Sequence, residues 1–170
     1  MNRKTLSLIL LLLSVPVISR AQEQEYKDPA GKFKLSLVGE WRAISYSDAV
    51  GRTKIEFVYG DRSEGLLKIT KERLNGESLA GKVQAEEDNF KFYRAGFERS
   101  TKERFDAGSL DGLRFAFFTT DSGRKTASAF YYLQDGDALW ILRFTGKRGV
   151  LDTIRNVTDR MVRSFTPLEK

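Results

Sequence analysis

A pair of basic residues just ahead of a helical pattern is the first feature of this sequence that could bind a ligand. Lys147 and Arg148 stand between two glycines at residues 146–149 (Gly-Lys-Arg-Gly). Free backbone N–H groups at a helix N-terminus, together with two cations, could hold a phosphate or a carboxylate. A solvated helix-entry turn is the favoured interpretation, because a phosphate-binding loop needs a longer glycine-rich signature. Asp152 in the first helical turn would also repel an anion.

Clustered acidic residues offer a different chemistry, that of a hydrolase or of a hard-cation site. The triplet at residues 86–88 (Glu-Glu-Asp), joined by Glu56 or Asp106, could supply a glycosidase pair or oxygen ligands for a metal. Adjacent residues on a helix point to different sides, so the triplet cannot converge on one ion unaided. We therefore expect a solvated helical face and assign no catalytic residue. A cell-envelope hydrolase that uses Asp and Glu carboxylates is kept as the alternative function.

Ser122 and Lys125 match the Ser-x-x-Lys spacing of one class of acyl-enzyme hydrolases. That chemistry places the serine on a helix with the lysine one turn later, whereas this pair lies in a glycine-containing turn between apolar segments. We interpret the match as chance. The chain also contains no histidine and no cysteine, which excludes an imidazole base, a thiol nucleophile, disulfides and thiolate metal sites. No cofactor and no metal are expected.

Aromatic residues are concentrated in the second half of the chain, and they could be either core or ligand contacts. Successive residues on a strand face opposite sides of a sheet, so not all of these rings can share one core. Packing beneath covering helices is the favoured interpretation. If one sheet face is partly open, Tyr131 or Trp140 would line a groove able to take a peptide, a glycan or a lipid fragment. The candidate partner- or anion-binding residues are Arg143, Lys147, Arg148, Tyr131 and Trp140, with Arg114 and Lys125 nearby.

A hairpin and a closing helix must position these candidates. Apolar runs at residues 127–133 and 138–145 are joined by residues 134–137 (Gln-Asp-Gly-Asp). Asp-Gly between apolar segments predicts a hairpin with a type I′ turn, which needs positive φ at both central residues. Apolar residues then recur at helical spacing and predict one amphipathic helix. Its stripe comprises Val150, Ile154, Val157, Met161 and Phe165, with Leu151 and Val162 beside them.

Apolar patterns in the rest of the chain extend the hairpin into a sheet. Residues 22–27 read as a frayed polar lead-in, and a helix capped by Ser78 or Asn75 is expected to end near Gly96. We therefore expect an α+β fold, a central antiparallel β-sheet meander flanked by helices. The expected further strands are 33–37, 41–44, 55–59, 66–74, 97–105 and 113–120. The strand at 66–74 is expected to pair with 55–59, and the one at 97–105 to be exposed and charged.

The first residues have the pattern of a cleaved secretory signal peptide. A short basic segment precedes an apolar run at residues 6–18, and Ser19 and Ala21 stand at the −3 and −1 positions of a cleavage site. The run is shorter than the roughly 20 residues of a membrane span, so an uncleaved anchor is the less favoured alternative. We expect residues 1–21 to be removed and residues 22–170 to form a single exported domain, periplasmic or secreted, with no transmembrane span.

The remaining charge is small. Residues 1–21 hold three of the 29 basic residues and none of the 23 acidic ones, so the rest of the chain has a formal charge of +3. Such a mildly basic surface does not indicate nucleic-acid binding. An electrostatic adaptor at an anionic membrane would require the basic residues to gather on one face.

The order of elements resembles the PsbP-like fold, which is named after an extrinsic photosystem subunit and is shared with a Ran release factor and exported bacterial proteins. The similarity rests on the strand at 33–37 followed by Trp41, the central helix, the last strand at 138–142 and a closing helix that ends in Ser164-Phe165. Val38 stands where family members usually carry proline.

The resemblance implies an α/β/α sandwich and a non-catalytic binding or assembly domain. It implies no photosynthetic role, because no metal- or partner-binding motif of the plant subunit can be mapped onto this chain. We expect a protein partner or a small ligand in the cell envelope, no nucleic acid, and a monomer or weak oligomer.

Overall fold

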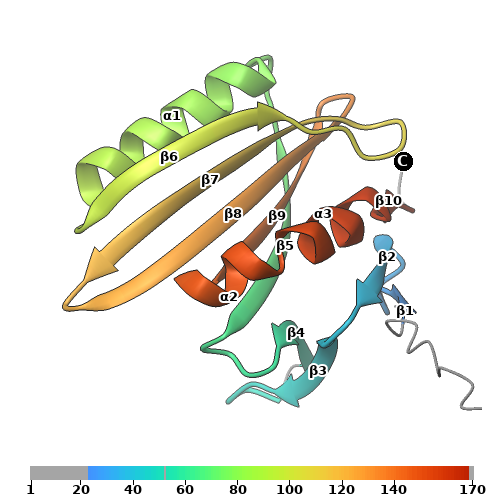
Figure 1. Ribbon diagram of the computed structural model, residues 1–170. Helices are drawn as coiled ribbons and strands as arrows, with labels where there is room; N and C mark the ends of the chain where they lie inside the picture. Colours follow the sequence, from blue (N-terminus) through green and yellow to red (C-terminus); the bar gives the residue numbers. More distant parts are fainter. Residues whose placement is uncertain (1–22, 52, 169–170) are drawn as a thin grey trace, which may run out of the picture.

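The computed structural model of the protein describes residues 23–51 and 53–168. The predicted signal peptide therefore lies outside the described residues. The described chain contains one large antiparallel sheet, one small sheet and three helices (Figure 1). The strands of the large sheet are β3 (Trp41–Ser47), β4 (Thr53–Tyr59), β5 (Gly65–Arg73), β6 (Phe97–Arg104), β7 (Asp111–Asp121), β8 (Arg124–Asp135) and β9 (Ala138–Lys147). Their spatial order is β3-β4-β5-β9-β8-β7-β6.

The small sheet contains one expected strand and two that the sequence did not indicate. It consists of β1 (Glu23–Lys27), β2 (Phe33–Val38) and β10 (Thr166–Pro167), in the order β1-β2-β10. The expected strand is β2, whose Phe33, Leu35 and Leu37 are buried on one face. The expected frayed lead-in is wrong, because β1 pairs with β2 along its whole length.

One face of the large sheet is covered by α1 (Leu79–Tyr93). Ser78 caps this helix as expected, and its hydroxyl accepts a hydrogen bond from the Gly81 backbone N–H at 3.0 Å. Val83 is fully buried, and Phe90 packs on the aromatic side chains of β7 and β8. Those aromatic side chains are Phe115, Phe117, Phe130 and Tyr132.

The opposite face is shared by the small sheet, α2 (Arg148–Thr153) and α3 (Arg155–Arg163), as Figure 1 shows. The expectation of one closing helix is wrong, since the chain leaves helical geometry at Ile154 (φ −94°, ψ 14°). The apolar stripe is buried all the same, because Leu151, Ile154, Met161 and Phe165 all pack into the core. The fold is α+β, but the expected sandwich is only partly correct, because a small sheet occupies part of the second helical layer.

The β8–β9 hairpin is confirmed, but its turn is of a different type. Gly136 has a φ of +62°, whereas Asp137 is not among the residues of positive φ. Positive φ at the first central residue alone fits a type II′ turn. The type I′ pattern occurs instead between β7 and β8, where Ser122 and Gly123 have φ of 49° and 78°. Ser122 therefore lies in a turn and lacks the helical setting that the Ser-x-x-Lys chemistry needs.

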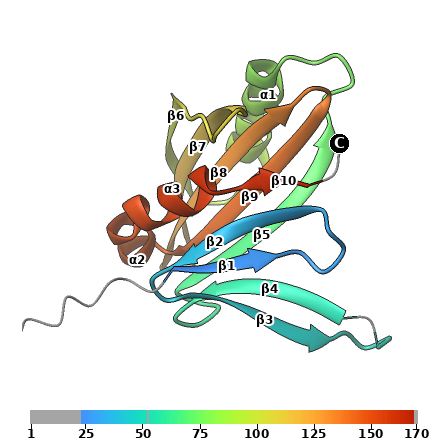
Figure 2. The same ribbon diagram turned by 90° about the vertical axis from the view of Figure 1, so that its right-hand side faces the viewer.

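The expected meander is correct for β6 to β9 and incomplete for β5. This strand pairs with β9 from Gly65 to Arg73, whereas it pairs with β4 through only two residues. Figure 2 shows β4 and β5 diverging from their point of contact. The expected change from strand to helix at residues 146–149 is confirmed, but no separate helix-entry turn lies there, because β9 continues through Lys147 and α2 begins at Arg148. A Cβ atom at Gly146 would lie 2.0 Å from the Glu64 carbonyl oxygen, so glycine is required where these two segments cross.

Candidate functional site

A cleft of about 270 Å³ lies between the helices α2 and α3 and the β6–β8 part of the large sheet. Its floor consists of small side chains from two neighbouring strands, Ala116 on β7 and Ala127 and Ala129 on β8. Phe118, Phe144 and Leu151 complete the apolar lining. Larger residues at the alanine positions would occupy this volume, so the sequence itself keeps the cleft open. We call it the arginine cleft, after the three arginines that line it.

The arginine cleft is lined by Arg99, Arg114 and Arg155, against the single acidic residue Asp152. Arg99 is exposed, and its guanidinium carbon lies 4.7 Å from the centre of the Phe118 ring. Among residues 23–51 and 53–168, no acidic side chain forms an ion pair with Arg99. This arginine is therefore a cation held over an aromatic face and available to a ligand.

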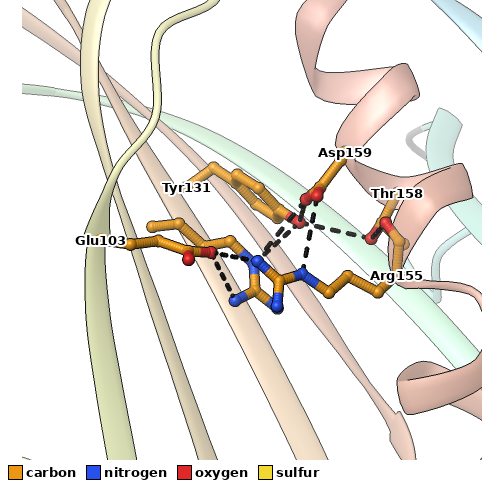
Figure 3. Close-up of polar contacts among 6 residues, drawn as sticks. Glu103, Tyr131, Arg155, Thr158 and Asp159 are labelled. Carbon is orange, nitrogen blue, oxygen red and sulfur yellow. Dashed lines mark hydrogen bonds and ion pairs between the residues drawn. The ribbon is translucent and has the colours of Figure 1, made fainter.

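Arg114 is only 8 % exposed and stands at the centre of a polar network at the inner end of the cleft. Its Nε donates to the Tyr131 hydroxyl at 3.1 Å, and its Nη1 donates to Glu103 at 3.0 Å. The Tyr131 hydroxyl donates in turn to Asp159 at 2.5 Å, and it also lies 3.3 Å from the Thr158 hydroxyl (Figure 3). Burial raises the pKa of Tyr131 to about 12, although the positive charge of Arg114 lowers it, and the hydrogen bond to Asp159 adds to the rise.

Arg155 closes the network from the helical side. Its Nη2 donates to Glu103 at 2.6 Å and its Nε lies 3.7 Å from Asp159 (Figure 3). The network thus joins α3 to β6, β7 and β8 and fixes the helix at the edge of the cleft. Because Tyr131 stays protonated at neutral pH, it acts as a hydrogen-bond donor and not as a base.

Two of the residues predicted from the sequence, Tyr131 and Trp140, lie in the core. They are 0 % and 2 % exposed, so neither lines an open groove. The Trp140 ring packs against Phe33 at 5.9 Å and Phe165 at 5.2 Å between ring centres. Both aromatic residues therefore pack in the core, which is the interpretation that the sequence favoured.

Arg143 lies on the other face of the sheet, beneath α1. It donates to the Thr70 hydroxyl at 3.0 Å and to Glu86 at 3.3 Å. Glu86 also accepts a hydrogen bond from the Tyr132 hydroxyl at 2.6 Å. Burial raises the pKa of Tyr132, and the neighbouring Glu86 carboxylate raises it further. Arg143 is thus engaged in holding α1 on the sheet.

Lys147 and Arg148 are adjacent in sequence but have different surroundings. Lys147 is exposed and lies 3.8 Å from Glu64 at a shallow basic pocket of about 260 Å³. Arg148 donates to Glu98 at 2.9 Å and lies 4.2 Å from the centre of the Phe118 ring, beside the arginine cleft. The five predicted residues therefore do not form one site: Arg148 adjoins the cleft at Phe118, and Tyr131 belongs to the polar network at its inner end.

The acidic triplet does not form the solvated face that we expected. Glu87 is only 5 % exposed and accepts hydrogen bonds or ion pairs from Ser100 at 2.5 Å, Lys102 at 2.7 Å and Lys91 at 3.0 Å. Burial raises the pKa of Glu87, but these three donors outweigh it and lower the pKa to about 2. Within the described parts of the chain, no three acidic side chains are grouped as they would be in a metal site.

Sequence reasoning missed Arg99, Arg155 and Asp159, which come together only when β6 and α3 meet. One signal was present in the apolar strands themselves. Ala127 and Ala129 are two residues apart and lie on the same face of β8, and Ala116 lies opposite Ala129 in the register. A row of alanines on one face of a core sheet indicates missing volume.

None of the helices in the described chain has the length and apolarity that crossing a membrane would require.

Comparisons with known proteins identify the fold but no close relative. No protein-family model matches the sequence, and no curated protein matches it. Solved structures do match over nearly the whole chain. Cyanobacterial PsbP (CyanoP) from Synechocystis sp. PCC 6803 is 12 % identical with a TM-score of 0.59, and the match covers 92 % of this chain and 98 % of that one.

Two further matches come from distant organisms. LpqN of Mycobacterium tuberculosis, involved in cell envelope biogenesis, is 13 % identical with a TM-score of 0.60 over 87 % of this chain and 91 % of its own. The Saccharomyces cerevisiae Ran-binding protein Mog1p is 9 % identical, with a TM-score of 0.60 over 88 % and 97 % of the two chains. These similarities confirm the resemblance found in the sequence: the chain has the PsbP-like fold.

Proposed function

We propose that the protein is an exported, non-catalytic binding domain whose arginine cleft takes a small organic anion with an apolar body. One observation carries the proposal. The cation of Arg99 has no ion pair in the described chain and lies over the Phe118 ring, directly beside a floor of alanines. An apolar floor with a few convergent polar groups is the usual form of a small-ligand pocket.

The lining of the cleft favours an anion over a neutral or cationic ligand. Three arginines face one acidic residue, Asp152, and two of the three already share Glu103 and Asp159 within the network. Arg99 is therefore the group that would meet a carboxylate or phosphate, because a planar guanidinium binds either one through two hydrogen bonds. The hydroxyl of Thr101, which lies opposite Ala116 in the register, would orient the rest of the ligand.

The state of the carboxylates speaks against the alternative of a hydrolase. A general acid of the glycosidase type needs a raised pKa. The carboxyl groups of the described chain whose pKa departs from its ordinary value are Asp61, Glu87 and Glu98, and in all three it is lowered. Each is bound by hydroxyls, backbone N–H groups or cations that favour the ionised form.

Export and the nature of the partner extend the proposal beyond the cleft. The signal-peptide pattern at residues 1–21 supports export, and LpqN, one of the similar structures, is involved in cell envelope biogenesis. We place the protein as a single domain, residues 22–170, in the periplasm or outside the cell, as a monomer or weak oligomer. Its partner would be an envelope protein or a small ligand and not a nucleic acid.

A series of six-carbon compounds tests the ligand class. The protein is titrated with hexanoate, hexyl phosphate, hexanol and hexylamine, and binding is followed by chemical-shift changes of backbone amides. We expect the two anions to shift amides that line the cleft, the alcohol to bind more weakly and the amine not to bind. Arg99→Gln should weaken hexanoate binding about fivefold, and Ala116→Leu should abolish it by filling the floor.

Arg73→Gln is the matched control, because Arg73 is also an exposed arginine and lies far from the cleft on β5. It should leave hexanoate binding unchanged. The ligand class is wrong if hexylamine binds as tightly as hexanoate, or if the anions shift amides outside the cleft only. Turnover of a cell-envelope polymer by the purified protein would overturn the non-catalytic assignment.

A further inference from the structure

The outer edge of β5 is open over most of its length. On its inner side β5 pairs with β9 from Gly65 to Arg73. On its outer side it pairs with β4 only through Phe57↔Leu67 and Val58↔Leu66, and the two strands then diverge (Figure 2). No other described strand neighbours this side of β5. Alternate residues of a strand direct their N–H and C=O groups to each side, so residues 68–73 present an unpaired backbone edge.

A groove of about 620 Å³ borders residues 67–70 of β5, between this strand, β4 and the small sheet. The register places Ile55 and Ile69 on the same face as the Phe57–Leu67 pair, toward Tyr26 and Phe33 of the small sheet. Both isoleucines are only partly buried. The Tyr26 hydroxyl, which also borders the groove, is buried and has no hydrogen-bond partner within the described residues. This wall of the groove is thus apolar, with one unsatisfied polar group.

The other face of the groove is basic. The same register places Lys68 on the side opposite Ile69, together with Glu56 and Lys54 of β4. Glu56 is already paired with Arg62 at 2.7 Å. Lys68 is exposed, and no ion pair joins it to any acidic side chain of the described chain. A strand added here would meet Ile69 on one face and Lys68 on the other, and farther along the edge Arg73 lies on the face of Ile69 and Glu72 on the face of Lys68.

We propose that residues 68–73 of β5 form a strand-addition site for an extended, acidic segment of a partner protein. The segment pairs its backbone with the open edge. An apolar side chain of the segment covers Ile55 and Ile69, and its acidic side chains face Lys68 on one side of the sheet and Arg73 on the other. This surface is separate from the arginine cleft, which is lined by other residues, and it does not depend on the ligand of that cleft.

A second copy of this chain fits the edge less well than a partner does. Residues 68–73 (Lys-Ile-Thr-Lys-Glu-Arg) contain three basic residues and one acidic residue. Two such edges would bring like charges together, and edge lysines are a common means of preventing self-association. An acidic segment would instead find complementary charge.

Two blocked six-residue peptides test the site, Glu-Val-Glu-Val-Glu-Val and Lys-Val-Lys-Val-Lys-Val. Each is added to the protein purified after expression of the full chain, and amide hydrogen exchange is measured residue by residue. We expect the acidic peptide to protect amides within residues 68–73 and the basic peptide not to do so. Lys68→Glu should weaken binding of the acidic peptide about threefold to fivefold at low salt. Lys125→Glu, the same charge change on β8, should leave it unchanged.

Three results would overturn the proposal. The first is unchanged exchange at residues 68–73 when the acidic peptide is saturating. The second is equal protection by both peptides, or equal weakening by Lys68→Glu and Lys125→Glu, since charge at the edge would then not select the segment. The third is protection that rises with protein concentration alone, which would assign the edge to a second copy. Hexanoate binding at the cleft is read separately, so the two proposals fail independently.

Discussion

The two faces of the large sheet are attached to their helices by the same kind of contact, yet only one face is closed. Tyr131 and Tyr132 are neighbours on β8 and point to opposite faces. The Tyr131 hydroxyl donates to Asp159 of α3, and the Tyr132 hydroxyl donates to Glu86 of α1. An arginine accompanies each pair, Arg114 on the first face and Arg143 on the second.

The faces differ in what surrounds these polar contacts. On the α1 face, phenylalanines fill the space, and Phe117 lies 4.9 Å from Phe90 and 5.3 Å from Phe130 between ring centres. On the α3 face, alanines occupy the positions above the network, and the arginine cleft remains. The comparison teaches that a helix can be anchored by a buried polar network at one point while its remaining face stands away from the sheet. Burial of the anchor and completeness of the packing are separate properties.

The largest expected effect separates the two arginines. Arg114→Met and Arg143→Met each remove a cation and keep an apolar chain. We expect the first to lower the free energy of unfolding by about 3 kcal/mol, because it removes the buried cation that donates to Tyr131 and Glu103 and leaves the half-exposed Arg155 as the cation of the network. The second should cost about 1 kcal/mol, because the side chain of Arg143 is 26 % exposed and water can replace part of its contacts. Urea unfolding measures both values, and equal costs would show that the two anchors are equivalent.

A second pair of variants compares the packing of the two faces. Val83→Phe adds volume under α1, where the side chain is fully buried, and should cost about 2 kcal/mol through overpacking. Ala116→Leu adds volume to the floor of the arginine cleft and should change the free energy of unfolding by less than about 1 kcal/mol. Thermal and urea unfolding of both variants would decide this. A cost for Ala116→Leu as large as that for Val83→Phe would mean that the cleft is closed in solution.

The single elements were largely predictable from the sequence, and the way they meet around the cleft was not. Period-two alternation, the Asp-Gly turn and the Ser78 cap predicted β2, the β8–β9 hairpin and α1, because each depends on residues that are close in sequence. The break at Ile154 was missed because the apolar stripe continues through it, and periodicity does not record a change of helix direction. The small sheet was missed because β10 has two residues and β1 has a polar sequence.

The site depends on contacts between segments that are far apart in the chain, which is why pattern reasoning placed it poorly. Glu103 and Arg155 are separated by 52 residues and Tyr131 and Asp159 by 28. The aromatic residue types at 131 and 140 suggested a ligand groove, but their burial is decided by the helices that cover them. The interpretation of Glu87 failed similarly, because its partners Ser100 and Lys102 belong to β6.

The smallest expected effect concerns acid stability, which we assign mainly to the α1 face. The pKa of Glu87 is about 2 in the folded protein, below that of a glutamate in an unfolded chain. Between about pH 5 and pH 2 the unfolded chain therefore binds more protons than the folded one, so this contribution is fully present above that range and is lost as the pH falls through it. Glu87→Gln should remove about 1 kcal/mol of the free energy of unfolding that is lost in acid, given the screening of the partly exposed Lys91 and Lys102.

Lys102→Met keeps the carboxylate and removes one of its partners, so it should reduce the same pH-dependent contribution to the free energy of unfolding. Unfolding free energies measured across this pH range provide the comparison. If the parent protein and Glu87→Gln lose the same free energy of unfolding as the pH falls, other carboxylates account for the acid sensitivity. The polar contacts of the α1 face would then be no more pH-dependent than those of the face with the cleft.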